Sequence, residues 1–80
     1  MVRLVNIKRT SEFIETEYIP EDSNEKGYVK MRLNDGEVVE RKLTSLDGVY
    51  VKPYFVQTRR CLREIKDDEN LPEQRLVMWY

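Results

Sequence analysis

Apolar residues occupy every second position on both sides of a central turn in the stretch 27–44. They are Val29, Met31, Leu33, Val39 and Leu43. A period of two is typical of half-buried strands, and the Asn-Asp-Gly sequence between the two runs predicts a hairpin turn whose glycine has a positive φ. A two-residue loop would pair Met31 with Glu40 and put charge on the apolar face, whereas a three-residue loop pairs Met31 with Val39. We therefore predict a three-residue loop, a type I turn followed by a bulge at Gly36.

The first twenty residues predict two further strands. The segments 2–8 and 12–19 are rich in Val, Ile, Phe, Tyr and Thr and are separated by Thr10 and Ser11. Large apolar side chains in the second segment fall on both parities, at Phe13, Ile14, Tyr18 and Ile19. We expect either that both faces of this strand pair are partly covered or that a bulge lies between them. Pro20 then ends the strand.

The hydrophobic period changes from two to about 3.6 after Pro53. One arc of about 100° holds Tyr54, Thr58, Cys61, Leu62 and Ile65, and the charged residues lie outside it. This pattern predicts an amphipathic helix over about 53–67, with the proline in its first turn. The segment before it predicts a turn at 45–48 and a short extended run at 49–51. The final stretch, 75–80, is dense in strand formers and is predicted to return to the sheet.

Together these elements predict a single α+β domain spanning residues 1–80. Its small antiparallel sheet would have about four to five strands, including the central hairpin 27–44, with the helix 53–67 on one face and a C-terminal strand. An all-β small barrel is the alternative, in which 58–66 pairs as a strand. The length agrees with one domain, because 80 residues can form only one shared core.

The composition limits where the protein can act. Charged residues make up 36% of the chain, and 14 Lys and Arg nearly balance 15 Asp and Glu, so the surface is densely ionic. No apolar run approaches the roughly 20 residues that cross a bilayer, and the charged start of the chain does not resemble a signal peptide. Cys61 is the only cysteine and has no partner for an internal disulfide. We expect a cytoplasmic protein without a membrane contact.

Several classes of catalytic site need side chains that this chain lacks. Without His, neither a Ser-His-Asp nor a Cys-His nucleophile can form, and one cysteine cannot build a Cys/His zinc site. Three isolated glycines form no phosphate-binding loop. We therefore expect no enzymatic activity, cofactor or metal, and a packing role for Cys61. A small carboxylate-based enzyme is an alternative, built on the acidic residues Glu12, Glu15, Glu17, Glu21, Asp22 and Glu25.

The basic face of the predicted helix is the first candidate site. Its members are Arg59, Arg60, Arg63 and Lys66. Such a face could contact phosphates, so weak nucleic-acid binding is one alternative function. The slightly acidic balance of the chain and the acids at 67–69 argue for weak polyanion binding at physiological salt. An acidic segment of a protein partner, or of a second copy, is the other ligand that this face could contact.

The aromatic end of the chain is the second candidate site. Trp79 and Tyr80 follow Leu76 and Met78 without a polar tail. An apolar patch beside an open sheet edge gives a direct route to self-association by strand addition. We therefore expect a non-enzymatic macromolecular interaction or regulatory module that binds an unknown protein partner or forms a homodimer.

Overall fold

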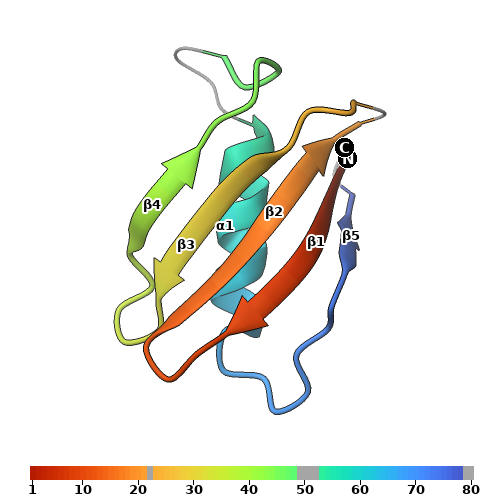
Figure 1. The fold of residues 1–80 in the computed structure, drawn as a ribbon. Coiled ribbons are helices and arrows are strands. Elements are labelled where there is room, and N and C mark those ends of the chain that lie inside the picture. The colour runs from red at the N-terminus through yellow and green to blue at the C-terminus, as the bar shows by residue number, and fades with distance from the viewer. Residues whose placement is uncertain (22, 49–52, 79–80) are drawn as a thin grey trace.

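Five strands form one antiparallel sheet, and a single helix lies across one of its faces (Figure 1). The computed structural model describes residues 1–21, 23–48 and 53–78. Its elements are β1 (Val2–Arg9), β2 (Phe13–Pro20), β3 (Gly27–Arg32), β4 (Val38–Lys42), α1 (Pro53–Ile65) and β5 (Arg75–Val77). The strand order is β4-β3-β2-β1-β5. The predicted α+β fold is therefore confirmed, and the barrel alternative is wrong because 58–65 is helical.

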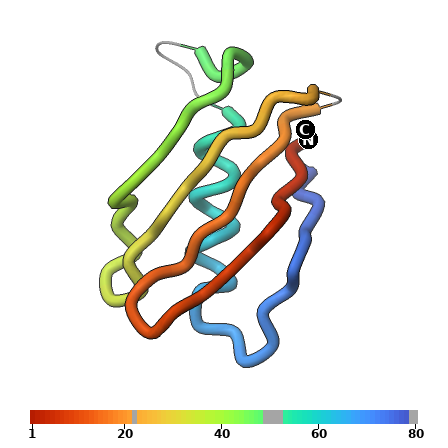
Figure 2. The backbone as a smooth tube through the Cα atoms, viewed as in Figure 1, coloured from red at the N-terminus to blue at the C-terminus, as the bar shows by residue number. Residues whose placement is uncertain are grey.

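The chain follows a meander through β1 to β4, crosses behind the sheet as α1 and returns beside β1 as β5 (Figure 2). The helix ends at Ile65, shortly before the predicted end, and β5 covers 75–77 only. The predicted extended run at 49–51 lies outside the described residues. Within the part of the chain that the structure describes, no helix has the length and hydropathy needed to cross a membrane.

The core lies between α1 and the covered face of the sheet. The helix buries Phe55, Thr58, Cys61, Leu62 and Ile65 against β1, β2, β3 and β5. Four of these five positions lie on the predicted arc; the fifth, Phe55, is buried where Tyr54 was expected. Tyr54 is only partly buried and its hydroxyl donates to Glu21 at 3.1 Å. The polar end of that ring is therefore satisfied at the surface of the protein.

A bulge in β1 explains the mixed parities at the start of the chain. Val2, Leu4 and Ile7 are all buried although they fall on different parities, and the register with β2 shifts between Val5 and Lys8. Within the shift, Asn6 has a φ of 54°, a left-handed conformation that asparagine tolerates well. The strand β2 itself is regular: Ile14 and Tyr18 are buried on the helix side, whereas Phe13 and Ile19 are half-buried on the other face. Both expected features therefore occur, a bulge in β1 and partial cover on both faces of β2.

The buried hydroxyl of Thr16 compensates this bulge. Its Oγ1 lies 2.9 Å from the carbonyl oxygen of Val5, and the Thr16 side chain is 1% exposed. We predict that Thr16→Val destabilises the protein by about 1–3 kcal/mol, because a buried acceptor loses its donor. Chemical denaturation measures this loss, with Thr16→Ser as the matched control that keeps the hydroxyl. Equal stability of the Val variant and the wild type would show that the hydroxyl does not compensate the bulge.

The β3–β4 hairpin has the predicted glycine conformation but a different loop. Gly36 has a φ of 71°, whereas the loop spans four residues because the Arg32 amide donates to the carbonyl of Glu37 at 2.8 Å. The predicted pairing of Met31 with Val39 is wrong: Met31 pairs with Val38, and the register shifts at that point. Val39 is left 42% exposed. With a four-residue loop and no shift, the odd-numbered residues of β4 would face away from the core. The one-residue shift turns them back, so that the Leu43 side chain still packs on the core.

Candidate functional site

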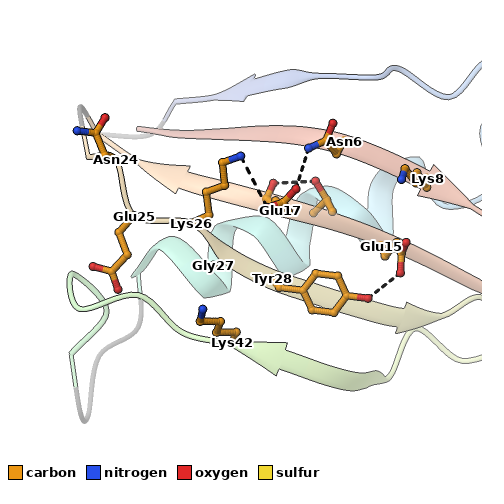
Figure 3. Close-up of a pocket in the computed structure, with 11 residues that line it drawn as sticks. Asn6, Lys8, Glu15, Glu17, Asn24, Glu25, Lys26, Gly27, Tyr28 and Lys42 are labelled. Atoms are coloured by element: carbon orange, nitrogen blue, oxygen red, sulfur yellow. Dashed lines mark hydrogen bonds and ion pairs between the residues drawn. The ribbon is translucent and has the colours of Figure 1, made fainter.

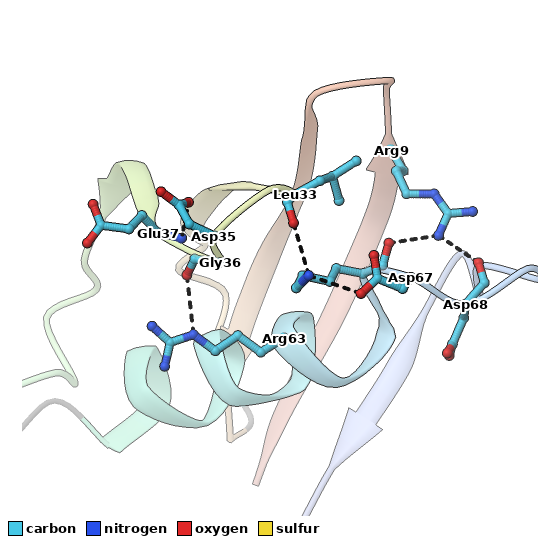
Figure 4. Close-up of polar contacts among 9 residues, drawn as sticks. Arg9, Leu33, Asp35, Gly36, Glu37, Arg63, Asp67 and Asp68 are labelled. Carbon is cyan, nitrogen blue, oxygen red and sulfur yellow. Dashed lines mark hydrogen bonds and ion pairs between the residues drawn. The ribbon is translucent and has the colours of Figure 1, made fainter.

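The basic residues of α1, and Lys66 directly after it, differ in their surroundings. Lys66 donates from Nζ to the carbonyl of Leu33 at 2.9 Å, and Arg63 donates from Nε to the carbonyl of Gly36 at 3.2 Å (Figure 4). Both contacts tie the β3–β4 loop to the helix. Part of the predicted basic face therefore holds the fold together.

Arg9 of β1 closes the C-terminal end of the helix. Its Nη1 donates to the carbonyls of Lys66 at 2.9 Å and of Asp68 at 2.6 Å (Figure 4). Both carbonyls lie in the turn that directly follows Ile65, near the negative end of the helix dipole, where a guanidinium is favourable. Arg9 thereby fixes the end of α1 relative to the sheet.

The arginines of the predicted basic face border three depressions. Arg59 and Arg63 line a groove of about 360 Å³ between α1 and β4, together with residues 37–41 and Phe55. Arg60 lines a second depression on the β5 side, beside Arg75. Arg59, Arg60 and Arg63 together line a third, open depression on the outer side of the helix. Three members of the predicted face are therefore neighbours on the surface, and two of them also reach the groove.

Two guanidinium groups approach the floor of this groove. The Cζ atom of Arg41, from β4, lies 5.2 Å from the centre of the Phe55 ring, and that of Arg59 lies 5.7 Å from it. Such contacts orient a cation over an aromatic ring and contribute about 0.5–1 kcal/mol at exposed sites. The ring itself is 4% exposed. The sheet and the helix together position the two arginines at one place.

Among the described residues, the arginines of the groove have no carboxylate partner within ion-pair distance. Arg41, Arg59 and Arg63 take part in none of the ion pairs. Two carboxylates, Glu37 and Glu40, also line the groove. Glu37 lies 3.7 Å from Arg32 on the loop, and Glu40 is the strand partner of Lys30. With three arginines against two carboxylates, the groove has a small excess of positive charge on a chain whose net charge is −1.

Sequence reasoning missed Arg41 and Phe55 as members of this site. Arg41 shares the odd parity of Val39 and Leu43, the positions assigned to the apolar face of the hairpin. A charged residue in that register was the available signal, since an edge strand can present such a side chain at the rim of the core. Phe55 carried no comparable signal, because Tyr54 competed for the same arc.

The acidic residues lie mainly on the open face of the sheet, the side without α1. Glu15 and Glu17 line an open depression of about 560 Å³ (Figure 3). Glu15 accepts a hydrogen bond from the Tyr28 hydroxyl at 2.6 Å, and burial together with this carboxylate raises the pKa of Tyr28 to about 12. Glu17 accepts from the side-chain amide of Asn6 at 2.7 Å. In the described ranges, no group of three acidic or cysteine side chains is placed to hold a metal ion.

The other acidic and sulfur groups have structural surroundings. Glu25 accepts from the amide and hydroxyl of Ser45 at 2.8 and 2.6 Å, and these bonds lower the pKa of its carboxyl. Cys61 is 3% exposed, and burial raises the pKa of its thiol. Trp79, Tyr80 and Asp22 lie outside the described residues. Close to the aromatic end, Leu76 and Met78 are 53% and 55% exposed.

The function of the groove is inferred from its geometry alone. No family model, curated protein or solved structure matches the chain. What the groove offers is an edge strand, a buried aromatic floor and three arginines without a carboxylate partner. This arrangement is suited to holding a negatively charged ligand.

Proposed function

We propose that this protein is a non-enzymatic interaction module that binds an acidic segment of a partner protein in the groove between α1 and β4. The observation that carries the proposal is the set of three arginines, Arg41, Arg59 and Arg63, around one groove without an ion pair among the described residues. Carboxylates of a ligand would gain charge-assisted hydrogen bonds there, and arginine is the side chain best suited to bind them with two bonds at once.

A peptide fits the groove better than a nucleic acid does. Bases are held by stacking on exposed aromatic rings, whereas Phe55 is 4% exposed. On the open face, Lys30 lies 4.5 Å above the Phe13 ring and Tyr28 is bonded to Glu15, so neither ring is offered to a base without breaking a contact. These features favour a protein ligand.

The surroundings of the acidic residues support a non-enzymatic role. A carboxyl that acts as a general acid near neutral pH needs a raised pKa, which burial in an apolar pocket provides. Glu25 has the opposite shift, because Ser45 donates two hydrogen bonds to the ionised form. Glu15 and Glu17 lie on the open face of the sheet and accept hydrogen bonds from Tyr28 and Asn6.

Two neighbouring arginines provide a matched test of the proposal. We expect Arg59→Glu to weaken the binding of a glutamate-rich peptide by about tenfold or more, roughly 1.4 kcal/mol, because it adds a negative charge to the groove. Arg60→Glu makes the same change in net charge on the next residue, outside the groove, and should change the affinity by less than about twofold. Fluorescence anisotropy of a labelled peptide measures both affinities.

The same experiment separates the proposal from nucleic-acid binding. Amide NMR spectra should show peptide-induced shifts centred on β4 and on the N-terminal half of α1. Thermal unfolding of both variants checks that they fold equally well. The proposal would be overturned if both variants lost the same peptide affinity and the protein bound a single-stranded oligonucleotide more tightly than the peptide. That result would indicate a general polyanion-binding surface.

A further inference from the structure

The strand β4 is an edge of the sheet. It pairs with β3 on one side, and no strand of the described chain pairs with its other side. Its residues from Val39 to Lys42 are exposed. An edge strand presents unpaired N–H and C=O groups that an extended peptide can bind by adding a further strand.

The register of the hairpin shows which backbone groups face outward. The Arg32 amide points to the side of β3 on which β4 lies, because it donates to the carbonyl of Glu37 directly before β4. Alternate residues of a strand direct their N–H groups to the same side. The backbone of Lys30 therefore also points to β4. Its partner Glu40 therefore directs its backbone inward, toward β3. Arg41, the next residue, directs its N–H and C=O outward to the free edge. The residue that places a guanidinium over Phe55 thus also offers its backbone to a ligand.

We infer that the acidic segment binds as an extended strand along β4, centred on Arg41, with acidic side chains at alternate positions. This inference rests on the proposed function. A ligand residue opposite Arg41 has its side chain on the same face of the sheet as the Arg41 side chain, and so do the residues two positions away on either side. That face is covered by α1, where Arg59 and Arg63 line the groove. Acidic residues separated by one residue would therefore meet the arginines together.

A second copy of this chain is a poor occupant of the same edge. Antiparallel pairing of β4 with itself about a two-fold axis at Arg41 would set this residue opposite its own copy and bring the two Arg59 side chains to the same side. Like charges directly opposite each other destabilise a strand pair. The charge of the groove selects a foreign, acidic strand.

Two short peptides of equal composition test whether the acidic residues must occupy every second position of the ligand. In the first, glutamate alternates with threonine; in the second, the glutamates are consecutive. We expect the alternating peptide to bind about tenfold more tightly, because only its acidic side chains all lie on the helix side of an added strand. Equal affinities would overturn strand addition and leave the proposed function standing. Failure of both peptides to bind would contradict the proposed function as well.

Backbone methylation of the alternating peptide tests the strand directly. Only alternate amides of an added strand face β4, so N-methylation of one residue type should abolish binding while methylation of the other leaves it within about threefold. The net charge and the side chains are the same in both peptides. Binding that survives both modifications, or is lost equally in both, would show that the backbone does not pair with β4 and would overturn the inference.

Discussion

Gly27→Ala should lower the free energy of unfolding by about 3 kcal/mol or more, at the upper end of what overpacking of a core produces. Gly27 and Tyr18 are opposite each other in β3 and β2. A Cβ atom at position 27 would overlap with Cζ of the Tyr18 ring. The ring is completely buried and its hydroxyl donates to Asp47 at 2.7 Å, so it has little freedom to move aside. To make room for the Cβ atom, either the two strands must move apart or this hydrogen bond must break.

Chemical denaturation of four variants, Gly27→Ala, Lys26→Ala, Tyr18→Ala and the double variant at 18 and 27, measures the effect of Gly27→Ala. Lys26→Ala is the control for a change at the adjacent, exposed position and should stay within about 0.5 kcal/mol of the wild type. Combined with Tyr18→Ala, which removes the ring, Gly27→Ala should have a much smaller effect than it has alone. A loss below about 1 kcal/mol for the single variant would mean that the ring is not held against Gly27.

Local patterns were sufficient to predict the elements and their arrangement. The alternation from Val29 onward and the Asn-Asp-Gly turn concern neighbouring residues, and the positive φ of Gly36 followed from them. The arc of Thr58, Cys61 and Leu62 likewise indicated which side of α1 packs on the sheet. These features depend on the identity of residues a few positions apart, so the sequence contains them directly.

Register depended on contacts that local patterns do not contain. The bulge at Asn6 is stable because Thr16, on another strand, supplies a hydrogen bond to Val5. The shift at Val39 accompanies a loop in which the Arg32 amide reaches the carbonyl of Glu37. Each irregularity is one residue in size, yet each decides which side chains face the core.

The candidate site was predicted in part, because the helical period finds basic residues but not their partners. Arg59 and Arg63 were identified, but they were grouped with Arg60 and Lys66 as one surface. Arg59, Arg60 and Arg63 do line one depression, but carbonyls of the β3–β4 loop accept hydrogen bonds from Lys66 and Arg63. Arg41 enters the groove from a strand far away in sequence. The packing of α1 across the sheet, with β4 at the edge, brings these residues together.

Asp47→Ala should destabilise the protein by about 3 kcal/mol, because one carboxylate serves three parts of the fold. Its Oδ2 accepts from the Tyr18 hydroxyl at 2.7 Å and from the Thr44 hydroxyl at 3.1 Å, and its Oδ1 accepts from the Phe55 amide at 3.1 Å. Each donor that loses its partner in a partly buried site costs about 1–3 kcal/mol. Asp47→Asn, which keeps one oxygen acceptor, should lose less. Denaturation of both variants measures the difference.

The same substitution links stability to the groove. Phe55 lies in the first turn of α1, where backbone amides lack partners within the helix, and Asp47 satisfies one of them. Without that bond the first turn should exchange its amide hydrogens faster, and the ring beneath Arg41 and Arg59 should be less firmly placed. Asp47→Ala should therefore also weaken binding of the alternating peptide, although Asp47 does not line the groove. Unchanged amide exchange at Phe55 and unchanged affinity in a folded variant would show that the groove is positioned without this carboxylate.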